Sequence, residues 1–155
     1  MLRQSFNEDW IFNKAGKEER RKVILPHDAM LEEKRTADAP SGSAGAYFHG
    51  DIYTYEKEFE APKEWERQHI LFQFEGVYRN AKVLLNGKEA GGAAYGYIPF
   101  FVCADGLLQY GSKNIIQVVA DVSRQPDSRG YSGGGIYRPV WLWTGAKEHI
   151  EPEGI

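Results

Sequence analysis

Residues 131–142 read YSGGGIYRPVWL, an abrupt change from small residues to aromatic and β-branched ones. Glycine lets a backbone turn through positive φ or pass close to a neighbouring segment. The residues that follow predict a strand over 136–143. Alternation along that strand puts Ile136, Arg138 and Val140 on one face, which we expect to be buried. A buried guanidinium needs a carboxylate partner, so we expect Arg138 to have a structural role.

The rest of the chain shows short apolar segments separated by turn residues. Strands are predicted over 51–59, 69–74, 81–85, 95–102 and 115–119. The dipeptide Asn86-Gly87 predicts a hairpin, because both residues tolerate positive φ. No amphipathic helix of three turns is evident. About eight short strands at even spacing indicate an all-β fold, an antiparallel β-sandwich with jelly-roll topology.

Two polar segments are predicted to be loops. Residues 14–22 are mostly charged, and residues 31–45 are rich in Ala, Ser, Gly and Pro without a usable period. Loops as long as the second are often functional. His27 and Asp28 follow Pro26, and we interpret them as a structural turn rather than a metal-binding or catalytic pair.

Composition narrows the classes of function. The chain has 155 residues, of which 42% are hydrophobic and 26% charged, as in a soluble domain with a sizeable core. The net charge of −3 provides no basic surface, so nucleic acid is not an expected partner. No run approaches the roughly 18 apolar residues of a membrane span, and the charged N-terminus does not resemble a signal peptide. A cytoplasmic location is therefore expected, although a trimmed signal would leave the same sequence.

The cysteine and histidine residues show no spacing typical of a metal site. Cys103 is the only cysteine, which excludes an internal disulfide and a cysteine-cluster zinc site. It ends an apolar run, so we expect a buried, unreactive thiol. No His-x-x-x-His spacing occurs among the histidines, which are His27, His49, His69 and His149. We therefore predict no metal and no cofactor.

Further short motifs precede the glycine-rich segment in a fixed order. They are Phe6-Asn7-x-x-Trp10-x-Phe12, Leu25-Pro26-His27-Asp28, Tyr53-x-Tyr55-x-Lys57-x-Phe59, Phe74-x-Gly76-Val77, Val83-x-Leu85-Asn86-Gly87, Gly96-Tyr97-x-Pro99-Phe100 and Leu108-x-x-Gly111-x-x-Asn114. Together these motifs resemble the N-terminal sugar-binding domain of family 2 glycoside hydrolases. That family includes β-galactosidases, β-glucuronidases and β-mannosidases. The resemblance extends over nearly the whole chain.

The resemblance implies a domain over 1–145 and a linker over 146–155. An immunoglobulin-like domain and a (β/α)8 barrel would follow as partners, with a possible homo-oligomer. The parent enzyme would be a retaining glycosidase, most simply β-galactosidase-like, acting on a carbohydrate substrate. In this family both catalytic glutamates lie on barrel strands. A barrel needs about 250 residues, so we expect no catalytic residue in this chain and no hydrolysis by it alone.

Two acidic residues near strand ends are the best carboxylate candidates. Glu75 alternates outward from the apolar face of its strand, and we interpret it as a solvated edge residue. Asp127 lies in Gln-Pro-Asp-Ser-Arg, where a turn role is the simpler interpretation. The resemblance adds a functional one, because in galactosidases of this family a carboxylate from this loop reaches the sugar. Asp127 matches that position best, and Arg129 is the alternative.

The loop over 45–51 is the second candidate sugar-binding segment. In the family, the segment before the Tyr-x-Lys-x-Phe strand can approach the mouth of the barrel. Tyr47 and Phe48 would stack on a sugar face, and His49 or Asp51 would bind hydroxyl groups. Ordinary loop packing is the simpler interpretation.

Two other functions remain open from the sequence. A stand-alone carbohydrate-binding module would need an exposed row of aromatic residues, for which Tyr53, Tyr55, Trp141 and Trp143 are candidates. A structural β-sandwich for protein interaction would bind no sugar. Fold class does not separate these functions, so the choice rests on the family motifs.

Overall fold

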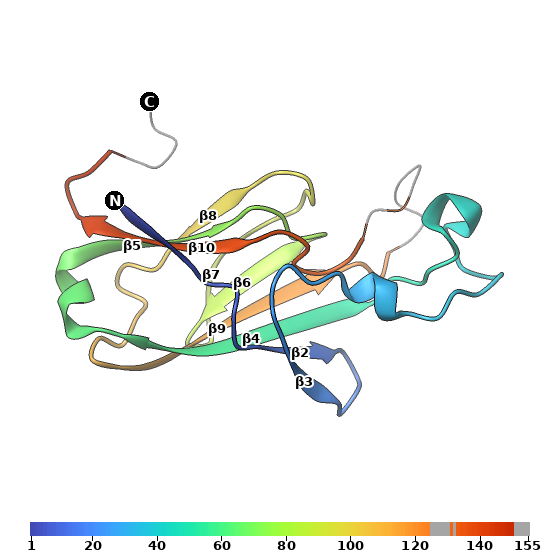
Figure 1. Ribbon diagram of the computed structural model, residues 1–155, viewed down its shortest axis with the longest axis horizontal. Helices are drawn as coiled ribbons and strands as arrows, with labels where there is room; N and C mark the ends of the chain where they lie inside the picture. The colour runs from blue at the N-terminus through green and yellow to red at the C-terminus, as the bar shows by residue number, and fades with distance from the viewer. Residues whose placement is uncertain (125–130, 132, 151–155) are drawn as a thin grey trace.

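Two antiparallel sheets pack face to face in the computed structural model, which describes residues 1–124, 131 and 133–150 (Figure 1). The smaller sheet runs in the spatial order β1 (Leu2–Ser5), β10 (Val140–Ala146), β5 (Gln68–Phe74) and β8 (Phe100–Cys103). The larger sheet runs in the order β3 (Arg20–Val23), β2 (Trp10–Lys14), β4 (Ile52–Ala61), β9 (Ser112–Asp121), β6 (Ala81–Leu85) and β7 (Lys88–Ala93). The predicted all-β sandwich is confirmed.

The helical content is small. Within the described residues, the helices are three short 3-10 turns: η1 (Ala29–Glu32), η2 (Gly42–Gly45) and η3 (Lys63–Arg67). This agrees with the prediction that no amphipathic helix of three turns occurs. None of the helices in 1–124 or 133–150 is long and apolar enough to span a bilayer.

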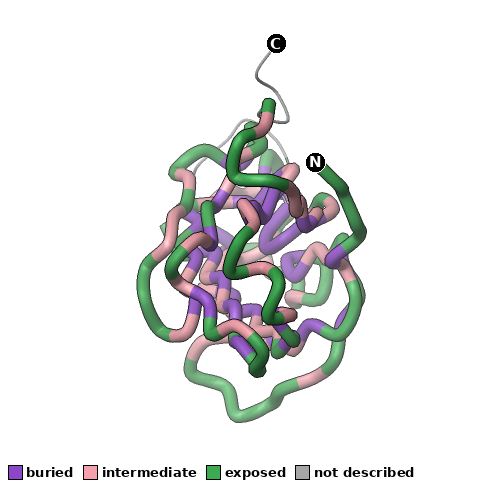
Figure 2. Tube along the Cα trace, turned by 90° about the vertical axis from the view of Figure 1, so that its left-hand side faces the viewer, coloured by how far each residue is buried: buried purple, intermediate pink, exposed green. Residues whose placement is uncertain are grey.

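Strand alternation builds the core between the sheets. On β4, Tyr53, Tyr55 and Phe59 face inward, and Phe72 on β5 faces them. The ring of Phe6 lies between the two layers, 5.4 Å from the Phe59 ring centroid and 5.0 Å from that of Phe72. Figure 2 shows the buried residues inside the layers and the exposed ones at the surface. Both central strands form where the sequence predicts them, over 51–59 and 69–74.

The β6–β7 hairpin forms where the sequence predicts it. Asn86 and Gly87 connect the two strands with φ values of 50° and 81°. Two successive positive φ values are the mark of a type I′ turn, whose twist matches that of the flanking strands. The hairpin prediction is confirmed.

Several strand boundaries differ from the prediction. β8 starts only at Phe100, and the predicted strand residues before it form a loop with Tyr95 and Tyr97 exposed. β9 extends over Ser112–Asp121, beyond the predicted 115–119, and Ile115 on its outward face is 38% exposed. The expected charged loop over 14–22 ends in strand β3, whose residues are mostly charged because only one end of it contacts the core. Hydrophobicity alone does not mark an edge strand of this kind.

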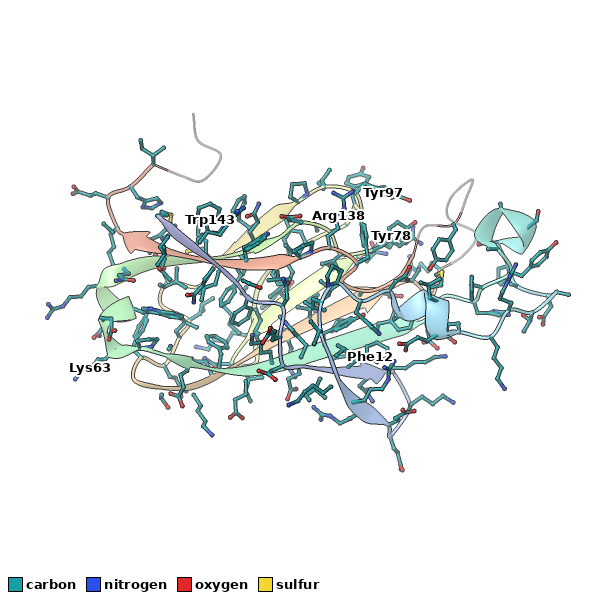
Figure 3. All side chains as sticks on the ribbon, in the orientation of Figure 1. Phe12, Lys63, Tyr78, Tyr97, Arg138 and Trp143 are labelled. Carbon is teal, nitrogen blue, oxygen red and sulfur yellow. The ribbon has the colours of Figure 1, made fainter. Side chains whose placement is uncertain are left out.

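Two expectations about buried side chains are wrong. The chain bends at Arg138 and β10 begins at Val140, so the alternation from Ile136 is broken and Arg138 is exposed. Its guanidinium carbon lies 5.7 Å from the ring centroid of the neighbouring Tyr137, and Figure 3 labels its side chain. Cys103 is also exposed, because it pairs with Leu71 on the outward face of β8.

Candidate functional site

One end of the sandwich gathers the loops that the sequence singles out. The segment with η1 and η2 lies there beside the chain that leads into β10 (Figure 1). The amide of Ala29 donates to the carbonyl of Gly134 at 2.8 Å, and that of His27 donates to Ile136 at 2.8 Å. On the other side, Tyr78 and Gly135 exchange two backbone hydrogen bonds of 3.0 and 2.8 Å. The glycine-rich segment is therefore held along both edges.

Asp28 fastens the two segments together. Its Oδ1 atom accepts hydrogen bonds from the backbone of Met30 at 3.1 Å and of Gly134 at 3.0 Å. Its Oδ2 atom accepts a bond from the Tyr131 hydroxyl at 2.5 Å. Burial, together with this carboxylate, raises the pKa of Tyr131 above its usual range. Asp28 is also the N-cap of η1, which confirms the predicted structural turn.

The glycines are required by close approach. A Cβ atom on Gly134 would lie 2.9 Å from the ring of Tyr53, and one on Gly135 would collide with the Tyr55 hydroxyl. Gly135 also has φ +97°, a conformation that side-chain-bearing residues rarely adopt. The segment thus crosses directly over the two core tyrosines, and the glycines are part of the packing.

His27 completes the packing under this segment. Its Nδ1 atom lies 2.7 Å from the Tyr55 hydroxyl, and its Nε2 atom lies 2.9 Å from a Glu32 carboxylate oxygen. Burial and the positive charge of Arg21 lower the pKa of His27 below its ordinary value, despite Asp28 nearby. The neutral ring donates from Nε2 to Glu32, which also pairs with Arg21. His27 has hydrogen-bond partners on both nitrogens, so its role here is structural.

Asp51 lies next to the chain that leads toward the predicted sugar-binding loop. The amide of Val122 donates to the Asp51 carbonyl at 2.9 Å. Beyond it, the Arg79 guanidinium donates to the carbonyl of Arg124 at 2.6 Å. Asp127 and Arg129 lie outside the described residues. The structure therefore brings Asp51 beside the segment that precedes them.

The side chain of Asp51 belongs to a small charged cluster. Lys14 Nζ lies 3.4 Å from Asp51 and 2.8 Å from Glu33, which also accepts a bond from the Tyr53 hydroxyl at 3.2 Å. Partial burial acts to lower the pKa of Lys14, but Glu33 and Asp51 outweigh it and hold that pKa above its usual value. The Asp51 side chain remains 38% exposed. Its Oδ1 atom accepts a hydrogen bond from the Ile52 amide at 2.7 Å.

His49 lies in a separate hydrogen-bond network. Its Nε2 atom is 2.6 Å from the Thr36 hydroxyl and 3.7 Å from an Asp38 carboxylate oxygen. The adjacent Phe48 ring packs against Tyr131, with centroids 5.7 Å apart. Tyr47 is exposed and lines a shallow hollow together with Arg35, Thr36 and Ala37. His49 and Asp51 thus share a loop but not their partners.

The family of the chain is shown by comparison with known proteins. The family model for the galactose-binding domain-like part of glycosyl hydrolase 2 matches residues 26–131, more than half of the chain. The chain belongs to this family. The resemblance predicted from the ordered motifs is confirmed.

Individual relatives of this galactose-binding-like domain are multidomain enzymes. A β-galactosidase of Bacteroides ovatus is 34% identical over 96% of this chain and 19% of its own length. A β-glucuronidase of Bacteroides fragilis is 33% identical over 85% of this chain and 19% of its own length. The chain therefore spans about a fifth of the curated relatives that it matches.

Solved structures agree with the sequence comparison. A family 2 glycosyl hydrolase from Bacteroides cellulosilyticus superposes with a TM-score of 0.86 at 29% identity, over 93% of this chain and 20% of the other. A β-glycosidase from Bacteroides vulgatus gives 0.84 at 30% identity with the same coverage. Both confirm the sandwich assigned to this galactose-binding-like domain.

The aromatic residues of the domain are divided between core and surface. Tyr53 and Tyr55 are fully buried, so the exposed row that a stand-alone binding module needs does not form from the four candidates. Trp141 and Trp143 lie on the outer face of β10, where they donate to Glu75 at 2.7 Å and Gln73 at 2.9 Å. Figure 3 labels Trp143. Glu75 is therefore half-buried and bonded to an indole.

Several residues at this end of the sandwich were not predicted from the sequence. Arg79 anchors the segment before Asp127, and Lys14, which also pairs with Glu33, holds Asp51, but these residues come from three separate segments. Local periodicity carries no signal for contacts of this kind. Asp28 is the exception, because an Asp two residues after a proline and just before apolar residues is a recognisable helix cap.

Proposed function

We propose that this chain is the non-catalytic galactose-binding-like domain of a retaining, β-galactosidase-like O-glycosidase. The matched relatives are named β-galactosidase and β-glucuronidase, and the chain spans about a fifth of their length. Retaining hydrolysis needs two carboxyl groups about 5–5.5 Å apart across the glycosidic bond. We place both on a following barrel, reached through an immunoglobulin-like domain and a linker over 146–155.

In this proposal, the loop end of the sandwich contributes to the sugar pocket. The observation that carries it is the anchoring of both flanks of residues 125–130. Arg79 holds the carbonyl of Arg124, and Asp28 holds the hydroxyl of Tyr131. Anchored flanks present a loop at low entropic cost, which favours precise contacts with a ligand.

The proposed sugar ligands are Asp127 or Arg129, with His49 and Asp51 beside them. A carboxylate accepts hydrogen bonds from sugar hydroxyl groups and so orients the ring for attack at its anomeric carbon. Such contacts lie away from the bond that breaks. Their loss is therefore expected to weaken productive binding more than it changes the chemical step.

The test is to express the complete open reading frame that contains this chain and to assay aryl β-galactosides and β-glucuronides. We expect hydrolysis, and a decrease of kcat/KM by about tenfold to hundredfold for Asp127→Asn, as for loss of a charged hydrogen bond. The same assay applied to Asp51→Asn, His49→Gln and Arg129→Ala ranks the four candidates. Asp9→Asn, an exposed carboxylate in the β1–β2 turn, is the matched control.

Two results would contradict the proposal. One is a full-length product that hydrolyses no O-glycoside. The other is unchanged kcat/KM in all four variants, which would leave the domain with a purely structural role. The 155-residue chain alone is expected to show no hydrolysis and no sugar-dependent change in tryptophan fluorescence.

A further inference from the structure

Three side chains with metal-ligand chemistry meet on the outer face of the smaller sheet. β5 and β8 pair Leu71 with Cys103, and the backbone ladder continues through a bond from the Ala104 amide to the Ile70 carbonyl at 2.9 Å. The same register sets His69 opposite Asp105. Opposed residues of antiparallel strands point to the same face, and so do residues two apart. His69, Cys103 and Asp105 therefore share one face.

The contacts agree with that register. His69 Nδ1 lies 2.5 Å from Asp105 Oδ2, and Asp105 Oδ1 accepts a bond from the Ile70 amide at 2.8 Å. One nitrogen, one sulfur and one oxygen atom from the three side chains all lie within 4.8 Å of one another. The carboxylate is positioned by the backbone, and Cys103 is exposed, so a hydrated ion has access to the group.

We propose that His69, Cys103 and Asp105 form a transition-metal site that takes Zn²⁺, with water in the fourth position. Imidazole nitrogen, thiolate sulfur and carboxylate oxygen are the three donors that zinc uses, at about 2.0–2.3 Å. Tetrahedral angles then separate the ligand atoms by about 3–4 Å, so small side-chain rotations close the site. Ca²⁺ and Mg²⁺ prefer oxygen donors and fit this set poorly.

The site also touches the segment that follows β10. The ring of His149 stacks on that of His69, with centroids 4.4 Å apart and an interplanar angle of 23°. The Nδ1 atom of His149 lies 2.9 Å from the carbonyl of Ala146. An ion that fixes the His69 ring would therefore steady this segment against the sheet. The inference does not depend on the proposed glycosidase function.

The sequence alone does not reveal this group. The expectation of no metal rested on the absence of close ligand spacing, whereas His69 and Cys103 are far apart along the chain. Their proximity is a property of the β5–β8 register. The predicted absence of a cysteine-cluster site is compatible with one thiolate among three different donors.

The experiment is a titration of the metal-free 155-residue chain with Co²⁺ and then with Zn²⁺. We expect one equivalent of Co²⁺ to produce a thiolate-to-cobalt charge-transfer band together with intense tetrahedral d–d bands, and Zn²⁺ to displace it. Affinity should fall with decreasing pH, because the ligands must lose their protons. The thermal midpoint should rise with Zn²⁺ concentration, since the ion binds the folded chain.

Variants locate the ion. Cys103→Ser should abolish the charge-transfer band, and His69→Gln should weaken Zn²⁺ binding by at least about tenfold. Cys103 is exposed, so its replacement should leave the metal-free thermal midpoint unchanged and keep the test valid if the His69 variant unfolds. Glu89→Gln, an exposed carboxylate on β7, is the matched control. Absence of the charge-transfer band in the wild-type chain, or equal binding by Cys103→Ser, would overturn the proposal.

Discussion

The carboxylate of Asp28 accepts a hydrogen bond from the amide of Gly134 at 3.0 Å, across 106 positions of the chain. This bond joins the turn after Pro26 to the glycine-rich segment from which the family was predicted. The same carboxylate binds the hydroxyl of Tyr131. One side chain therefore positions the segment that leads into the last strand and the residue that follows the predicted sugar-binding loop.

Replacing Asp28 should destabilise the fold. Asp28→Ala leaves the amides of Met30 and the buried Gly134 without their acceptor, which costs about 1–3 kcal/mol of unfolding free energy. Asp28→Asn should cost less, because its amide oxygen still accepts from the backbone. Urea denaturation measures both, with Asp9→Asn as the control. Equal stability of Asp28→Ala and the wild type would show that these bonds do not hold the segment.

The close approach of Gly135 to Tyr55 predicts a steric effect separable from backbone strain. Gly135→Ala adds a Cβ that collides with the Tyr55 hydroxyl, at a φ of +97°. Gly16→Ala has a similar positive φ of +76° but nothing within 4 Å of the new atom. Strain alone costs about 1 kcal/mol in Gly16→Ala. Urea midpoints should show a distinctly larger loss for Gly135→Ala, and equal losses would contradict the packing described here.

The buried ring of His27 predicts a loss of stability in mild acid. Burial, with Arg21 next, lowers the pKa of folded His27 below its ordinary value of 6.5, so the unfolded chain takes up a proton first. The contribution of His27 is complete above about pH 6.5 and is lost as the pH falls toward the lower folded pKa. Urea midpoints from about pH 8 to about pH 5 measure it. His27→Gln should flatten the profile over that range, and an unchanged slope would contradict the assignment.

Asn114 is the centre of a buried amide network that joins two of the sequence motifs. Its oxygen accepts from Asn86 at 2.8 Å and from the Gln109 amide at 2.7 Å, and its nitrogen donates to the carbonyls of Gln109 and Ser112. Asn114→Asp puts an acceptor where two carbonyls need a donor. The expected loss is at least about 2 kcal/mol near neutral pH.

The pH dependence of that variant supplies its control. Protonation of Asp at position 114 restores one donor, so the loss relative to wild type should shrink in acid. Asn13→Asp makes the same change at an exposed pair of carbonyls and should show a smaller effect. Differential scanning calorimetry at several pH values compares the two variants. A loss at position 114 that stays constant with pH would mean that the network does not depend on this donor.

Local patterns predicted much of the architecture correctly. Alternation identified the strands β4 and β5, and Asn86-Gly87 identified the hairpin, because both signals depend on residues that are close in sequence. The ordered motifs identified the family. The candidate ligands Asp127, Arg129, His49 and Asp51 were inferred from that resemblance, and they remain predictions.

The sequence by itself determined the all-β class, the two-sheet alternation, the tight turn and the family, since each follows from local backbone preference or from ordered short motifs. Only the tertiary structure decided which strand ends turn outward. A bend at Arg138 and the register of Leu71 with Cys103 placed two expected core side chains at the surface. The tertiary structure also decided the partners of Asp28 and the contact between His69 and Asp105. The pairing register between distant strands sets these contacts, and this register cannot be deduced from a short window of sequence.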